Sequence, residues 1–170
     1  MSLDLFPLVS WDRVDDDLAD LLLGRWHYLG ACRRPFGRHS FGLQVAEVGI
    51  VAVAVSASTV NAACAGWPRG EVVELARLAV HPDHRWATRV ALRLWRTVAP
   101  PAWAADQWPV RACVSYANTA RGHTGEVYRL DGWRKVADVP GGVAGGNWTR
   151  GKRYDPKSVW TFVLPEEKAA

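Results

Sequence analysis

The block 115–133, SYANTARGHTGEVYRLDGW, holds the residues best suited to proton-transfer chemistry. An apolar strand expected over 110–116 brings Ser115 and Asn118 to its carboxyl end, the edge at which open α/β sheets bind ligands. Just beyond it come His123 and a short helix that carries Tyr128. A hydroxyl, an imidazole and a phenol gathered in this way can hold and transfer protons. The plainer alternative is that each is an ordinary hydrogen-bonded side chain.

A strand, a turn and a helix follow one another over 71–99, and this unit predicts a site for an anion. Arg85, Thr88 and Arg89 lie where the helix begins, and the free N–H groups and dipole of a helix N-terminus attract phosphate. The turn contains no glycine, so its backbone is poorly suited to wrap closely around a pyrophosphate. Arg77 lies within the apolar strand, where a buried guanidinium needs a partner. It either pairs with a glutamate near the start of that strand or binds an anion.

Two basic loops contain aromatic residues and suit a nucleic-acid backbone. The first 20 residues hold six Asp and one Arg, a net charge of −5, which leaves +9 on the rest of a chain whose total is +4. Phosphate contacts through these loops would make DNA binding fall steeply with salt. The alternative is that both loops are simply solvated. Their basic residues are Arg33, Arg34, Arg38, Arg150, Lys152 and Arg153.

The elements that position these residues follow from hydrophobic periodicity and from the places of proline and glycine. We expect one domain over 1–170, with flexible ends at 1–9 and 165–170. In the first half, the pattern predicts a helix over 10–24, strands over 41–45 and 49–56, a loop over 59–70 and a strand over 72–80. A helix from 87 that ends at Pro100-Pro101 and a connector over 102–108 follow. The second half has strands over 110–116, 133–139 and 158–164, a helix over 124–130 and a loop over 140–146.

Composition excludes several classes of protein. No apolar run approaches the roughly 18 residues of a membrane span, and the acidic N-terminus lacks the layout of a signal peptide, so we expect a cytoplasmic protein. Three cysteines without CxxC spacing indicate reduced thiols rather than disulfides or a zinc site. Two histidines without a placed carboxylate support no metal assignment.

In element order, residues 10–164 resemble the GNAT acyltransferases. The resemblance implies an α/β (α+β) fold, in which a mixed sheet with helices on both faces is splayed between its fourth and fifth strands. It also implies acyl-CoA in the splay, with its pyrophosphate on the turn after the fourth strand. Arg77, Arg85, Thr88 and Arg89 would then bind the cofactor. Because the usual glycines are missing from that turn, the donor stays unknown, with acyl-CoA as one candidate.

Three motifs within this frame resemble the Mom family, the phage Mu Mom-like DNA modification proteins. They are HYLG at 27–30, ELARLAV at 74–80, and the block that begins SYAN at 115 and ends GHTGEVY at 128. The resemblance implies conversion of the exocyclic amine of adenine in duplex DNA to a carbamoylmethyl derivative that blocks restriction enzymes. It marks as site residues His27, Tyr28, Arg77, Ser115, Asn118, His123 and Tyr128.

One of these positions departs from the family, which has Asp where this chain has Asn118. An amide cannot accept a proton at neutral pH. Either His123 or His27 is then the proton acceptor, or the activity differs.

Three functions follow from these patterns. The first is a Mom-like enzyme, with double-stranded DNA and a small-molecule donor as partners, which needs an aromatic pocket with a basic rim for an extruded base. The second is an acyl-CoA-dependent N-acyltransferase acting on a small amine or a protein. The third is an inactive relative that only binds DNA. A homodimer is compatible with each.

Overall fold

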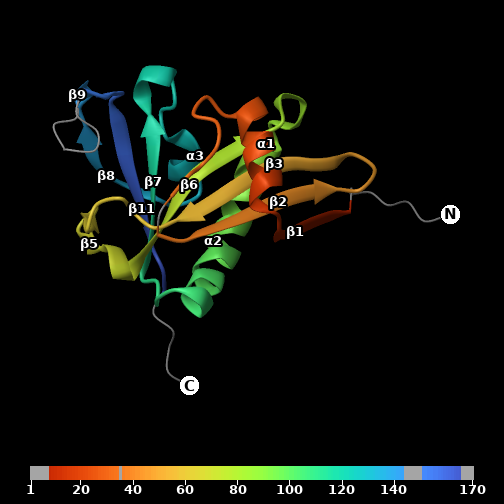
Figure 1. Ribbon diagram of the computed structural model, residues 1–170, viewed down its shortest axis with the longest axis horizontal. Coiled ribbons are helices and arrows are strands. Elements are labelled where there is room, and N and C mark those ends of the chain that lie inside the picture. The colour runs from red at the N-terminus through yellow and green to blue at the C-terminus, as the bar shows by residue number, and fades with distance from the viewer. Residues whose placement is uncertain (1–7, 35, 144–150, 166–170) are drawn as a thin grey trace.

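A seven-stranded mixed sheet, in the order β1-β2-β3-β6-β7-β11-β8, forms the frame of the protein (Figure 1). The computed structural model describes residues 8–34, 36–143 and 151–165, so most of the predicted flexible ends, the last part of the predicted loop over 140–146, and Arg150 lie outside the described residues. The strands of the sheet are Val9–Arg13 (β1), Arg38–Val45 (β2), Gly49–Ala57 (β3), Val72–Val80 (β6), Ala112–Asn118 (β7), Arg134–Val139 (β8) and Lys157–Val163 (β11).

Short elements complete the described chain. Two hairpins of two-residue strands pair Ala63–Cys64 (β4) with Trp67–Pro68 (β5), and Gly142–Val143 (β9) with Arg153–Tyr154 (β10). The α-helices are Asp16–Trp26 (α1), Ala87–Asp106 (α2) and Glu126–Leu130 (α3). Single 3-10 turns cover Arg69–Glu71, Pro82–His84 and Thr119–Arg121.

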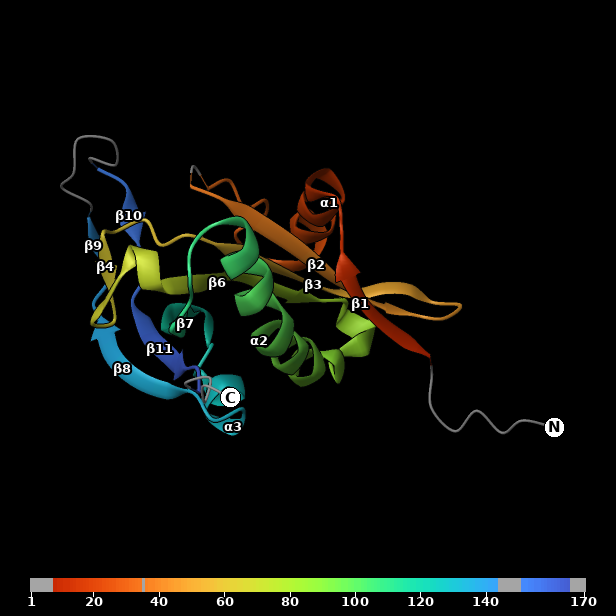
Figure 2. The same cartoon turned by 90° about the horizontal axis from the view of Figure 1, so that it is seen from below.

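The two long helices cover opposite faces of the sheet (Figure 2). Side chains alternate between the faces along a strand, and β3 illustrates this. Val53 and Val55 pack against α1, whereas Ala52 and Ala54 belong to the clusters on the α2 side. The apolar run of β3 is therefore buried on both sides, which positions α1 and α2 relative to the strands between them.

The N-terminal segment differs from the helix that we predicted over 10–24. Its first part is β1, which pairs antiparallel with β2, and Trp11 stacks on Phe41 with ring centroids 5.8 Å apart. Helix α1 begins later, where the carboxylate of Asp15 caps two N–H groups, and it continues past Gly24. Pairing with β2 is a non-local gain that outweighs the local helical pattern.

Helix α2 also runs beyond its predicted end, because it continues through Pro100-Pro101 into the segment predicted as a connector. A proline inside a helix costs about 3 kcal/mol or more. The indole of Trp103 is fully buried in the main core, and Trp95 lies in the same cluster from the same helix. Burial of these large side chains offsets the hydrogen bonds lost at the prolines.

The sheet opens between β6 and β7, its fourth and fifth long strands. The two run parallel but pair only from Val72 opposite Ala112 to Leu75 opposite Ser115. Beyond that point β6 stays paired with β3, and β7 stays paired with β11. This confirms the predicted fold class, a mixed sheet splayed at that place with helices on both faces.

Candidate active site

A cavity of about 1080 Å³ lies at the opening between β6 and β7. It is lined by all seven site residues that the three motifs marked. They come from the segment just after α1, from β6 and β7, from the segment that leads into α3, and from α3 itself. These residues are His27, Tyr28, Arg77, Ser115, Asn118, His123 and Tyr128. The fold thus gathers into one place side chains that are scattered along the sequence.

A hydrogen-bonded pair, Ser115 and Tyr128, marks the corner of the opening. Ser115 Oγ donates to the carbonyl of Leu75 at 2.9 Å, in the last residue pair of the β6–β7 ladder. A hydroxyl has one hydrogen, so in the 2.9 Å contact between Ser115 Oγ and Tyr128 the phenol is the donor. Burial raises the pKa of Tyr128, although its hydrogen bond with Ser115 acts in the opposite direction. The phenol therefore holds its proton at neutral pH.

Gly125 allows α3 to bring Tyr128 into this position. Its φ of +80° is a left-handed conformation that favours glycine, and a β-carbon there would overlap the indole ring of Trp160 on β11. The ring of Tyr128 packs between Trp133 and Trp160, at centroid distances of 5.2 and 5.8 Å. A phenol held in this way has little freedom to leave the corner.

His27 is a hydrogen-bond donor to the cavity rather than a proton acceptor. Its Nδ1 accepts from the N–H of Leu29 at 3.1 Å, so the hydrogen of the neutral ring is on Nε2. Burial and the nearby charges of Arg77 and His123 lower the pKa of His27 from 6.5 to about 4. At neutral pH the ring is uncharged, and we no longer consider it a candidate general base.

Aromatic rings line part of the cavity. The rings of His27 and Tyr28 stack at 4.7 Å, and those of Tyr28 and His123 at 5.6 Å. The guanidinium of Arg121 lies 5.5 Å from the centre of the Tyr28 ring, which is 42% exposed. Exposed stacked rings next to a cation offer a surface for a planar or charged group.

Asn118 holds the turn that leads to His123. Its Oδ1 accepts from the N–H of Arg121 at 3.2 Å, and its Nδ2 donates to the carboxylate of Asp155 at 2.8 Å. The side chain is buried, with both ends of its amide engaged. These contacts favour a positioning role for Asn118 over the proton transfer considered from the sequence.

Glu74 is a cavity residue that our sequence-based site did not include. Its side chain is 3% exposed, and one carboxylate oxygen accepts from Arg34 at 2.6 Å. Burial raises the pKa of Glu74, against the opposing effects of Arg34, Arg77 and Lys157. A carboxylate whose pKa is raised is a better proton acceptor than an ordinary glutamate. The available signal was a charged residue within an otherwise apolar strand.

A β-bulge brings Glu74 and Arg77 to the same face of the sheet. Leu75 lies opposite Ser56 and Arg77 lies opposite Val55, so Ala76 is an extra residue in β6. Residues three apart in a regular strand point to opposite faces. The extra residue changes this, and both charged side chains line the cavity on the α1 side of β6.

Part of the backbone of the turn before α2 is engaged within the turn itself. The N–H and the hydroxyl of Thr88 both go to the carbonyl of Arg85, at 3.2 and 3.0 Å, and the N–H of Asp83 goes to His81 Nδ1. These groups are used within the turn and are not free to bind an anion there. Arg85 and Arg89 are exposed beside Thr88, which itself lines the cavity.

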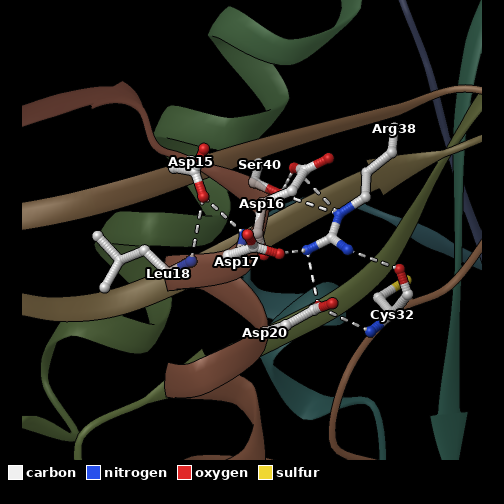
Figure 3. Close-up of polar contacts among 8 residues, drawn as sticks. All are labelled: Asp15, Asp16, Asp17, Leu18, Asp20, Cys32, Arg38 and Ser40. Atoms are coloured by element: carbon white, nitrogen blue, oxygen red, sulfur yellow. Dashed lines mark hydrogen bonds and ion pairs between the residues drawn. The ribbon is translucent and has the colours of Figure 1, made fainter.

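Two arginines of the first basic loop, Arg34 and Arg38, form ion pairs inside the protein, whereas the sequence predicted that they contact DNA. Arg38, whose side chain is 12% exposed, lies 2.8 Å from the carboxylate of Asp20 and 3.2 Å from that of Asp16 (Figure 3). It also donates to the carbonyl of Cys32 at 2.9 Å. Arg34 is likewise engaged by its buried carboxylate partner. Charged groups at such depth require partners, which accounts for both arginines.

The other basic residues keep their predicted accessibility where they are described. Arg33, Lys152 and Arg153 are exposed, and Arg150 lies outside the described residues. Within the described ranges, no group of three or more His, Cys, Asp or Glu side chains is placed to hold a metal ion. In the same part of the chain, no helix is long and apolar enough to cross a membrane.

Comparison with known proteins identifies the fold. No protein-family model matches the sequence, and no curated protein does either. Among solved structures, the ribosomal-protein-S18-alanine N-acetyltransferase of Escherichia coli matches with a TM-score of 0.63 at 11% identity, over 96% of this chain and 100% of that one. NAA60 of Arabidopsis thaliana in complex with acetyl-CoA matches with 0.62 at 8% identity, over 92% and 99%.

A third match is the spermidine/spermine N-acetyltransferase SpeG of Vibrio cholerae, with a TM-score of 0.59 at 8% identity, over 91% of this chain and 92% of that one. At such low identity the likeness concerns the fold, and the resemblance to the Mom family remains a hypothesis from the motifs. The chain has the GNAT fold that its element order predicted.

Proposed function

We propose that the protein is an N-acyltransferase that moves an acyl group from a thioester to an amine in the cavity between β6 and β7. The observation that carries this proposal is the buried Tyr128 phenol, which holds its proton at the corner where the strands separate. The three N-acetyltransferases of the same fold support it, one of them a complex with acetyl-CoA.

Part of the site suits an acyl-CoA and part of it does not. The edge of β6 beyond Leu75 and the side chain of Thr88 line a cavity wide enough for an acyl-thioester arm. Several donors of the turn before α2 are used within the turn, and the exposed side chains of Arg85 and Arg89 would add positive charge for a pyrophosphate. When bound, the thioester supplies the electrophilic carbonyl.

The residues of the chain then have separate tasks. Glu74 accepts the proton that the amine nitrogen loses as the new C–N bond forms. Tyr128 gives its proton to the departing sulfur as the C–S bond breaks, and water later restores it. The neutral His27 ring offers an Nε2 hydrogen to developing negative charge. Proton transfers of this kind each accelerate a reaction by roughly 10²- to 10⁴-fold.

Acyl transfer can be tested by measuring free thiol released from acetyl-CoA and longer acyl-CoAs with a panel of amines, together with the mass of the product. We expect amine-dependent release that is lost in Tyr128→Phe. Ser10→Ala, which removes an exposed hydroxyl on β1 outside the cavity, is the control. Absence of release with every pair, combined with absence of acyl-CoA binding by calorimetry, would refute the proposal.

A second candidate is the Mom-like modification of adenine in DNA. It is favoured by the stacked rings of His27, Tyr28 and His123 beside Arg121, which would suit an extruded base. The test is mass analysis of nucleosides from cells that express the protein. A carbamoylmethyl adenosine would support this candidate. Unchanged nucleosides with salt-sensitive DNA binding would favour an inactive DNA-binding relative instead.

A further inference from the structure

We propose that the amine acceptor is zwitterionic, with a carboxylate next to its amino group as in an α-amino acid. Glu74 would receive the amino group and Arg77 the carboxylate. This inference rests on the proposed acyl transfer and names the class of its acceptor.

The first support is the placement of the two side chains. The extra residue Ala76 brings Glu74 and Arg77 to one face of β6, and both line the cavity. A carboxylate and a guanidinium presented together at one wall match the two opposite charges of an amino acid. Without the bulge, one of the two side chains would point toward α2.

The second support is that Glu74 has bonding capacity left. Arg34 donates to one of its carboxylate oxygens. Among the described residues, no side chain or backbone group donates to the other oxygen. A buried carboxylate gains most from a further charged donor, and an ammonium group carries three N–H donors. The free oxygen of Glu74 therefore suits the amino group of an acceptor.

The third support is the state of Arg77. One terminal nitrogen donates to the carbonyl of Ala76 at 2.7 Å, which holds the guanidinium close to its own strand. Its Nε is buried and has no hydrogen-bond partner among the described residues. A buried N–H donor without a partner is costly. The second terminal nitrogen makes no hydrogen bond within the described residues either, and a carboxylate in the cavity would give it an acceptor.

The charges around Glu74 favour a zwitterionic acceptor over a simple amine. Arg34, Arg77 and Lys157 all act electrostatically on the one carboxylate of Glu74. A cationic amine would add to the excess of positive charge around Glu74, whereas a zwitterion adds no net charge. Since like charges repel more strongly away from bulk water, the site favours an acceptor that carries its own negative group.

The experiment measures binding, so it does not depend on turnover. Each of the common amino acids is titrated into the full-length protein by calorimetry, along with its decarboxylated amine and its deaminated acid. We expect at least one amino acid to bind roughly 10- to 100-fold more tightly than either analogue. Arg77→Met should remove the advantage over the amine, and Arg77→Lys should restore part of it. Glu74→Gln should remove the advantage over the acid.

Two exposed residues provide matched controls. Arg134→Met and Glu47→Gln alter the same charges away from the cavity and should leave the affinities unchanged. The proposal is refuted if no amino acid binds, if amines bind as tightly as amino acids, or if Arg77→Met weakens both equally. Thiol release from acyl-CoA with simple amines would still support acyl transfer in that case. Absence of release with every acceptor would count against acyl transfer itself.

Discussion

Replacing Tyr128 by Phe separates the chemistry of this site from its architecture. The substitution removes one oxygen, while the ring keeps its contacts with Trp133 and Trp160. Ser115 keeps its hydrogen bond to the carbonyl of Leu75, because that bond uses the hydrogen of the serine. The fold therefore loses a single neutral hydrogen bond, worth about 1 kcal/mol of unfolding free energy.

The expected effect on catalysis is much larger. A positioned proton donor contributes roughly 10²- to 10⁴-fold to the rate, which corresponds to about 2.7–5.4 kcal/mol in the transition state. We expect kcat to fall by this factor. Because substrate contacts elsewhere in the cavity are unchanged, we expect KM to change little. A destabilisation of about 1 kcal/mol leaves nearly all molecules folded and cannot produce such a loss.

The assay uses two thioesters that share an acyl group but differ in their leaving thiol. An alkyl thiolate such as that of CoA needs a proton as it departs, whereas a more acidic aryl thiolate leaves without one. The ratio of wild-type to Tyr128→Phe rates should therefore be large for the alkyl thioester. For the aryl thioester it should be close to the ratio for the Ser10→Ala control, which lies outside the cavity. Equal losses with both thioesters, or no loss with either, would refute the role of Tyr128 as the proton donor.

Three further predictions concern the elements around the site. Gly125→Ala should lower the free energy of unfolding by about 2–5 kcal/mol in chemical denaturation, from left-handed strain and overlap with Trp160. Gly24→Ala, in the open interior of α1, should raise it by about 0.5–1 kcal/mol; equal effects would contradict the packing argument. The folded protein binds a proton at His27 less readily than the unfolded chain does. The contribution of His27 to the free energy of unfolding is therefore complete above pH 6.5 and is lost as the pH falls toward 4. Over this range the free energy of unfolding should change by at most about 1.36 kcal/mol per pH unit. His27→Asn keeps an acceptor for the N–H of Leu29 and should flatten melting temperature against pH in that window; an unchanged profile would show that another group is responsible. Arg38→Met should lower the free energy of unfolding by about 1–3 kcal/mol, whereas the exposed Arg33→Met should not; if only DNA affinity changed, the internal role of Arg38 would be wrong.

Local pattern determined the parts of the fold whose signals lie within a few residues. The apolar strand before the 81–86 turn and the start of the helix after it fall where periodicity predicts them. The bounds of strand β7 and helix α3 lie within two residues of the predicted ones. The motif residues from His27 to Tyr128 could be listed from the sequence, because their types and spacing are local properties. The order of the elements resembles that of the GNAT acyltransferases, and this resemblance implied the splayed sheet.

Tertiary structure decided the features that depend on distant partners. Strand β1 exists because β2 pairs with it, and α2 passes through Pro100-Pro101 because its tryptophans fill the core. The role of an arginine depends on the carboxylate with which it pairs. In the sequence, Asp20 is 18 residues from Arg38, and Glu74 is 40 residues from Arg34. No local pattern specifies such partners.

The active-site chemistry shows the same division. The sequence supplied Glu74 and Arg77 as charges three apart in a strand, a spacing that normally separates them. Only the register between β3 and β6, with its one extra residue, places both in the cavity. Strand register is fixed by the packing of two whole faces of a sheet. The sequence alone therefore identified the two charges, and the tertiary structure determined that they line the same cavity.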